Sequence, residues 1–237
     1  MTLTPAQQPA DHIREHLSLL ADSERRALVW IAGRLPARIN SDHLSALALL
    51  SMLAAGVSFA SFRVTSWAAL GVIVSLIANW FGDSLDGTVA RVRGQQRPRY
   101  GFYVDHVIDL AGTALLMAGL ACSGVMNPIL AAILLAAYLL VAAESYLTTH
   151  AAGIFRMSFL GFGPTELRIV LAAGALKVVS SPWIALGGFL EVRLFDLGGI
   201  VAIAGLTLAF IVSAVRNTLA LYAAEPRPAP AGESRAA

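Results

Sequence analysis

Charged residues and cysteines are both scarce in this chain of 237 residues. Only 14% of the residues are charged and 57% are hydrophobic, whereas a typical soluble domain is about 25% charged. The single cysteine, Cys122, excludes an internal disulfide and a zinc site built on cysteines. The net charge of +2 is too small to indicate a nucleic-acid partner. Together these features predict a multi-pass integral membrane protein whose partners include membrane lipids and no nucleic acid.

The two ends of the chain are its polar parts. Residues 1–40 lack the early apolar core of a signal peptide and are expected to form a juxtamembrane segment. Within it, Asp22 or Ser23 could cap an amphipathic helix around Trp30 that lies on the membrane surface. A soluble helix packed on a partner is the alternative. Residues 223–237 are rich in proline and alanine, which predicts a disordered tail.

Residues 41–222 are predicted to form one membrane domain. A helix needs about 20 apolar residues to span a bilayer. Six runs come near this length: 43–62, 66–85, 102–122, 128–148, 165–181 and 197–221. The predicted fold class is therefore all-α, an integral membrane six-helix bundle with an N-terminal amphipathic surface helix. Proline and glycines interrupt the stretch 182–196, which we expect to be a re-entrant or interfacial connection.

The arginines predict how the bundle is oriented. With six spans, 14 of the 17 basic residues fall on the side that holds both termini, and only Arg63, Lys177 and Arg193 fall opposite. Basic residues concentrate in the cytoplasmic loops of membrane proteins. We therefore expect the loop between the second and third spans, around Arg97, to face the cytoplasm.

Four aspartates flank that loop, at the ends of two apolar segments: Asp83, Asp86, Asp105 and Asp109. At about 100° per residue, each pair falls on one face of its helix. Gly94 and Pro98 would break a continuous helix between the pairs, so the two faces can turn toward each other. Four carboxylates that close cannot all stay ionised unless cations neutralise them. Aspartate oxygens suit Mg²⁺ or Mn²⁺, so we predict a metal site. A structural polar network with Arg91, or a cation pathway, is the alternative.

The spacing of these residues carries a family resemblance. The segment reads Asp-x2-Asp-Gly-x2-Ala-Arg-x9-Gly-x3-Asp-x3-Asp, with eight fixed positions over 27 residues. It resembles the signature of the CDP-alcohol phosphotransferase family. The resemblance implies an enzyme of phospholipid biosynthesis, in which an alcohol oxygen attacks the phosphorus of a CDP-linked donor and CMP leaves. It also implies a two-metal site for Mg²⁺ or Mn²⁺ and a possible homodimer.

The resemblance assigns roles to the residues of the signature. Asp83, Asp86 and Asp105 would ligate metal, and Asp109 would be both a ligand and the catalytic general base. The substrate-binding residues would be Gly87, Ala90, Arg91 and Gly101. The small residues could instead serve tight helix packing, and Arg91 could instead anchor the helix at the cytoplasmic surface.

Residues outside the signature could complete the site for the alcohol or lipid acceptor. The candidates for this pocket are His106, Arg156, Thr165, Glu166 and Arg168. Each has a structural alternative. His106 could be a buried structural residue and Arg156 a surface anchor, and the Thr165 segment could be an ordinary helix N-terminus. Asn79 lies one turn before Asp83 and could support the site or hydrogen bond to another helix. Glycerol phosphate, inositol phosphate, serine and diacylglycerol all remain open as acceptors.

Two other functions fit an aspartate-rich membrane protein. An aspartate-rich membrane prenyltransferase also uses Mg²⁺ on a pyrophosphate, but it would not require Gly87, Ala90 and Arg91 at these spacings. A cation transporter could use the buried carboxylates, but it would not explain Gly87 and Gly101 at fixed distances from them.

Overall fold

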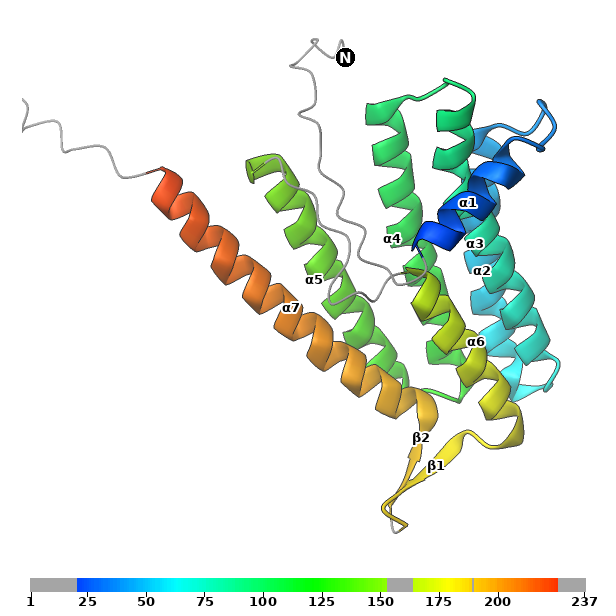
Figure 1. The fold of residues 1–237 in the computed structure, drawn as a ribbon. Coiled ribbons are helices and arrows are strands. Elements are labelled where there is room, and N and C mark those ends of the chain that lie inside the picture. The colour runs from blue at the N-terminus through cyan, green and yellow to red at the C-terminus, as the bar shows by residue number, and fades with distance from the viewer. Residues whose placement is uncertain (1–20, 153–163, 189, 226–237) are drawn as a thin grey trace, which may run out of the picture.

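The structure is a computed structural model that describes residues 21–152, 164–188 and 190–225 (Figure 1). The predictions for residues 1–20, for the tail beyond 225 and for Arg156 lie outside the described residues. The described elements are α1 (Ala21–Ala32), α2 (Ser41–Ala60), a short 3-10 turn (Ser61–Arg63), α3 (Ala68–Val92), α4 (Pro98–Ser123), α5 (Pro128–Ala152), α6 (Pro164–Ser180), β1 (Trp183–Leu186), β2 (Leu190–Arg193) and α7 (Leu194–Ala224).

Local sequence explains where the helices begin and end. Asn40 caps α2: its side chain accepts a hydrogen bond from the backbone of His43, and the His43 ring accepts one in return from the backbone of Asn40. Gly94 follows α3 with a φ of 64°, which glycine adopts without strain. Pro98 then opens α4, where its missing N–H costs nothing. The predicted break between the two halves of the signature is confirmed.

Close packing of α2 against α3 and α4 forms the centre of the bundle. Phe59, Val72, Leu76 and Leu120 are buried in this core. At Gly56 a Cβ atom would lie 2.5 Å from the Leu115 carbonyl oxygen, so α2 and α4 touch through their backbones. Such contacts through small residues are common between helices in membranes.

Five of the described helices are long and apolar enough to cross a membrane: Ser41–Arg63, Ala68–Val92, Pro98–Ser123, Pro128–Ala151 and Leu194–Ala224. The predicted all-α integral membrane bundle is confirmed. The sixth predicted span is α6, which has 17 residues and is shorter than a full crossing of about 20 residues. Figure 1 shows that α6 begins beside the middle of the bundle rather than at its upper end.

A polar cluster inside the membrane region joins α5 to α7. Glu144 of α5 is buried and accepts hydrogen bonds from Thr148 (2.8 Å), Ser213 (2.9 Å) and Asn217 (2.7 Å). Ser213 and Asn217 lie on α7, and Figure 1 shows the two helices side by side, leaning away from α2 and α3. A carboxylate in a spanning helix is costly unless it is hydrogen-bonded. This cluster is the polar contact that accounts for Glu144.

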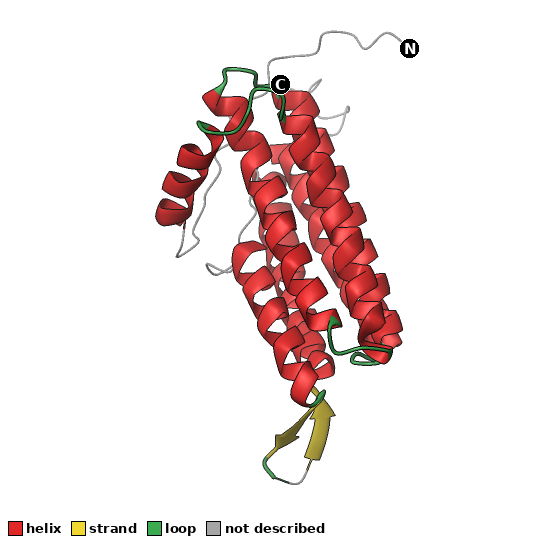
Figure 2. Ribbon diagram, turned by 90° about the vertical axis from the view of Figure 1, so that its right-hand side faces the viewer, coloured by secondary structure: helices red, strands yellow, loops and turns green. Residues whose placement is uncertain are grey.

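The connection between α6 and α7 is not the re-entrant segment that was one of the two forms expected for it. It is an antiparallel hairpin in which Trp183 pairs with Arg193 and Leu186 with Leu190. Gly187 and Gly188 have positive φ angles at the turn, where they permit the reversal. Figure 2 shows the hairpin projecting beyond the ends of the helices. The glycines that interrupt the apolar run thus make a turn between strands rather than a break in a membrane-embedded loop.

The N-terminal helix α1 lies against the outside of the bundle (Figure 1). Its Leu28 and Ala32 are buried with Leu85 and Val89 of α3. The opposite side is exposed: Trp30 is 59% exposed, and the Arg34 guanidinium lies 3.9 Å from the centre of the Trp30 ring. The helix is therefore amphipathic, as predicted, with its apolar side packed on α3.

Candidate active site

The four aspartates of the signature lie on the last turns of α3 and the first turns of α4. All four are half-buried. They are close enough for their charges to interact: Asp109 is repelled by Asp83, Asp105 and Asp86, and Asp86 is repelled by Asp105 and Asp83. The turn through Gly94 and Pro98 therefore brings the two carboxylate pairs together.

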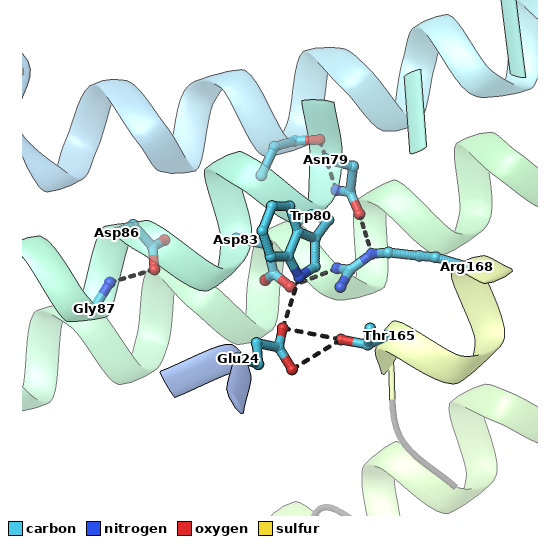
Figure 3. A network of polar contacts seen from close by, with 9 residues as sticks. Glu24, Asn79, Trp80, Asp83, Asp86, Gly87, Thr165 and Arg168 are labelled. Atoms are coloured by element: carbon cyan, nitrogen blue, oxygen red, sulfur yellow. Dashed lines mark hydrogen bonds and ion pairs between the residues drawn. The ribbon is translucent and has the colours of Figure 1, made fainter. Parts of the chain in front are cut away.

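Asp83 is held by an arginine from α6. The Nη2 atom of Arg168 lies 2.5 Å from Oδ2 of Asp83, and its Nε atom donates to Asn79 Oδ1 at 2.8 Å (Figure 3). Asn79 in turn donates through Nδ2 to the Ala48 carbonyl oxygen of α2 at 3.0 Å. Asn79 thus makes both a helix–helix hydrogen bond and a contact to a residue beside the site. A charged arginine side chain that donates through two nitrogens is suited to fixing Asp83 and Asn79 relative to each other.

Asp86 is fixed from α2 and from its own helix. Ser45 donates its hydroxyl to Asp86 Oδ2 at 2.6 Å, and the Gly87 backbone N–H donates to Oδ1 at 2.5 Å. Figure 3 shows the Gly87 contact. The role of Ser45 was not predicted, because Ser45 lies 41 residues from Asp86 and one serine in an apolar helix has no distinguishing pattern.

Gly87 and Gly101 of the signature make no tight packing contact among the described residues. A Cβ atom added at Gly87 would meet only the Arg91 Nη1 atom, at 3.8 Å, and one added at Gly101 would meet nothing within 4 Å. By contrast, a Cβ at Gly82 would lie 2.6 Å from the Leu44 carbonyl oxygen. Gly82 therefore permits the close contact of α2 with α3, whereas Gly87 and Gly101 border open space.

Arg91 lies at the exposed end of α3, near these open positions. Its Nη2 atom donates to the Thr88 hydroxyl at 3.0 Å, and Thr88 donates to the Ser84 carbonyl oxygen. Ala90 beside it is half-buried. The guanidinium is thus directed along α3 at the level of Gly87.

The loop between the two halves of the signature is tied to the segment before α2. Arg93 donates to the carbonyl oxygens of Ile39 (2.5 Å) and Leu35 (2.9 Å). Arg97 forms an ion pair with Asp42 at 2.5 Å. The hydrogen bond to Asp42 raises the pKa of the Arg97 guanidinium above its ordinary value. These contacts hold the ends of α3 and α4 in register with the start of α2.

Asp105 and His106 lie on α4, and the His106 ring packs against α5. The His106 ring is buried, lies 3.8 Å from Asp105 through Nδ1 and contacts the Phe102 carbonyl oxygen at 2.6 Å through the same atom. It packs on Phe102 and edge-on against Tyr146 of α5. Tyr138, also on α5, hydrogen bonds to Thr113 and lies within electrostatic reach of Asp109. Neither tyrosine was predicted, because nothing in the sequence sets them apart from other aromatic residues of a spanning helix.

The start of α6 supplies the remaining candidates. Thr165 donates its hydroxyl to Glu24 of α1 at 3.1 Å, and Glu166 lies in the first turn of α6. Thr165 is thus one turn from Arg168 and its contact with Asp83 (Figure 3). Of the residues predicted for the acceptor pocket, Arg168 contacts Asp83 and His106 lies 3.8 Å from Asp105.

The donor chemistry at this site fits a divalent cation. Carboxylate oxygens are the ligands that Mg²⁺ and Mn²⁺ prefer, and the four aspartates bring their charges together. In the part of the chain that the structure describes, no three acidic, histidine or cysteine side chains are gathered tightly enough to form a preformed metal centre. Arg168 and Ser45 instead occupy oxygens of Asp83 and Asp86.

Comparison with known proteins identifies the class to which this fold and signature belong. The family model for CDP-alcohol phosphatidyltransferase matches residues 42–211, well over half of the chain. The chain belongs to the CDP-alcohol phosphatidyltransferase family. It is therefore a membrane transferase of phosphate-containing groups in phospholipid biosynthesis, as the signature predicted. This assignment argues against a prenyltransferase and against a cation transporter.

A solved structure shares the fold. The chain is similar to the crystal structure of a Mycobacterium tuberculosis phosphatidylinositol phosphate synthase with CDP-DAG bound, at 19% sequence identity and a TM-score of 0.56. The similarity covers 86% of this chain and 100% of that chain. No match was found among curated protein sequences.

Proposed function

We propose that the enzyme transfers a substituted phosphate group from a CDP-linked lipid donor to an alcohol acceptor and releases CMP at the cluster of four aspartates. The observation that carries the proposal is the complete signature, with its four carboxylates within electrostatic reach of one another. A CDP-linked lipid as donor is supported by the solved structure of similar fold, which contains CDP-DAG.

The carboxylates have distinct parts in this proposal. The CDP-alcohol phosphatidyltransferase family generally depends on divalent metal, and Asp83, Asp86, Asp105 and Asp109 would hold Mg²⁺ or Mn²⁺. Two divalent ions, when bound, neutralise the negative charge of the pyrophosphate and of the leaving CMP. Asp109 takes the proton of the acceptor hydroxyl as that oxygen attacks the phosphorus, because an ionised carboxylate at hydrogen-bond distance is a suitable general base. The bond from phosphorus to the CMP oxygen breaks, and CMP leaves.

The open face of the signature binds the nucleotide. Gly87 and Gly101 border free space, so the cytidine and pyrophosphate can approach the backbone there. Ala90 continues this shallow surface, and Arg91 lies at its exposed end. A guanidinium binds pyrophosphate oxygens well because its N–H groups form paired, charge-assisted hydrogen bonds.

The acceptor enters from the side of α5 and α6. Thr165, Glu166 and Arg168 lie at the start of α6, and His106 lies between α4 and α5. Arg156 is proposed to complete this pocket, and its position falls outside the described residues. A basic pocket of this kind would suit a phosphorylated acceptor.

We further propose that the aspartates face the cytoplasm and that the enzyme forms a homodimer. The arginine distribution supports the orientation, since 14 of the 17 basic residues fall on one side of a six-span arrangement. The family resemblance alone supports the dimer. The domain boundary of 41–222 also stays a prediction.

The test is a product analysis with purified enzyme in detergent. CDP-diacylglycerol is combined in turn with glycerol phosphate, inositol phosphate and serine, and diacylglycerol is combined with CDP-choline or CDP-ethanolamine. One pair should give CMP and a new lipid by mass spectrometry in the presence of Mg²⁺ or Mn²⁺. Glu191→Gln, which changes an exposed acid on β2, should retain this activity. Absence of CMP with every pair would contradict the proposal.

A further inference from the structure

Glu24 of the N-terminal helix joins two helices that carry site residues. Its Oε1 atom accepts a hydrogen bond from the Trp80 indole N–H at 2.6 Å and one from the Thr165 hydroxyl at 3.1 Å. Trp80 lies on α3 and Thr165 on α6, and the three side chains meet in Figure 3. A carboxylate that accepts from two side chains forms charge-assisted bonds, which are stronger than neutral ones. Glu24 therefore connects α3 to the start of α6.

This contact lies next to the residues that hold Asp83. Trp80 follows Asn79 directly and precedes Asp83 by about one turn. Thr165 precedes Arg168 by about one turn, and Arg168 contacts both Asn79 and Asp83. Fixing the start of α6 against α3 thus sets the distance that Arg168 must bridge.

The apolar side of α1 packs against the same part of α3. Leu28 and Ala32 pack with Leu85 and Val89, and these two α3 residues are fully buried, one position before and three positions after Asp86. The helix thus packs on the part of α3 that carries the signature, beside the aspartates.

We propose that α1 helps to form the site and that Glu24 is a positioning residue. Glu24 fixes the position of the start of α6, and with it the positions of Thr165 and Arg168. The family model matches residues 42–211, so α1 lies outside the residues that it matches. The inference rests on the proposed function, in which the start of α6 forms part of the acceptor pocket. Glu24 itself contacts none of the four aspartates through the bonds observed here; it acts through Trp80 and Thr165.

The test compares Glu24→Ala and Glu24→Gln with Arg25→Gln, a matched control that removes a charge from the exposed neighbouring position. Steady-state kinetics are measured separately for donor and acceptor. Glu24→Ala should raise the acceptor KM about tenfold, as expected from one lost charge-assisted bond, and leave the donor KM within about twofold. Glu24→Gln keeps an acceptor oxygen and should restore much of the acceptor affinity. Arg25→Gln should match the parent.

A second readout does not depend on activity. Nitroxide labels at Ala27→Cys in α1 and Leu167→Cys in α6, both exposed positions, report the separation of the two helices by EPR in a Cys122→Ser background. The distance distribution should be narrow in the parent and in Arg25→Gln, and broader in Glu24→Ala. A merely stabilising residue would lower the unfolding temperature and leave the acceptor KM per folded molecule unchanged.

The outcomes separate this inference from the proposed function. If the parent releases CMP but Glu24→Ala has parental kinetics or a parental distance distribution, the inference is wrong and the proposed function stands. If the parent releases no CMP with any substrate pair, the proposed function fails, and the EPR result alone decides whether Glu24 sets the position of α6. An unchanged distribution would overturn the inference in that case as well.

Discussion

Two glycines on α3 give a sharp test of which small residues serve binding and which serve packing. Gly82 faces α2: a Cβ there would lie 2.6 Å from the Leu44 carbonyl oxygen and 2.8 Å from the Ala48 backbone nitrogen. Gly87 faces open space, where the nearest atom to an added Cβ is Arg91 Nη1 at 3.8 Å. The two residues are five positions apart on the same helix, so they form a matched pair.

The sizes of the two effects follow from these contacts. Replacing glycine by alanine inside a helix gains about 1 kcal/mol in helix propensity. At Gly82 the clash is with backbone atoms, so α2 and α3 must separate, and overpacking of this kind costs about 1–3 kcal/mol. Gly82→Ala should therefore lower the unfolding temperature. Gly87→Ala has no such clash and should leave stability unchanged or raised.

A larger residue at the open position then tests binding. Gly87→Leu and Ala90→Leu should fold but lose affinity for the CDP-linked donor, because the side chain would occupy the surface that the nucleotide is proposed to approach. Both should keep their affinity for Mn²⁺. Thermal unfolding in detergent and donor affinity are measured on the same preparations. Unchanged donor affinity in Gly87→Leu would show that the nucleotide does not bind at Gly87. A loss of stability in Gly87→Ala equal to that in Gly82→Ala would show that Gly87 serves helix packing.

Three further predictions follow from the site and the fold. Asp109→Asn should bind donor and metal almost as well as the parent while turnover falls by about 10²–10⁴, the usual contribution of a positioned base; near-parental turnover would remove Asp109 from catalysis. In a Cys122→Ser background, Gln95→Cys should be labelled from the cytoplasmic side and Ser66→Cys, exposed between α2 and α3, from the opposite side. Labelling of both from one side would contradict the orientation. Glu144→Ala should lower the free energy of unfolding by about 1–2 kcal/mol, because three donors of α5 and α7 lose their acceptor. Glu144→Gln should lower it less. If the Ala variant is as stable as the parent, Glu144 does not hold α5 against α7.

The sequence was sufficient for the elements that depend on local patterns. The break at Gly94 and Pro98 and the pairing of the aspartates follow from residue spacing, and the fold agrees with them. All six apolar runs are helices, and five of them are long and apolar enough to span a membrane. The family assignment followed from the same segment, because eight fixed positions leave little room for chance.

Contacts between distant segments were not predictable in the same way. Ser45 and Asp86, Glu24 and Thr165, and Glu144 and Asn217 lie 41, 141 and 73 positions apart. No periodicity in one helix indicates which residue of another helix it will meet. The hairpin after α6 was missed for a related reason: its glycines are equally compatible with a broken membrane segment and with a turn between two strands.

The measurement that bears most directly on the central claim is CMP release by the parent and by Asp86→Asn, assayed side by side with CDP-diacylglycerol and the acceptor found by product analysis. The parent should release CMP with Mg²⁺ or Mn²⁺ and stop when EDTA is in excess. Asp86→Asn should stay folded, since the asparagine oxygen can still accept from the Gly87 N–H and its amide N–H can donate to the Ser45 hydroxyl oxygen, but it should lose CMP release because a shared carboxylate ligand is gone. Parental CMP release by Asp86→Asn, or by the parent in excess EDTA, would contradict a metal-dependent transferase site at these aspartates.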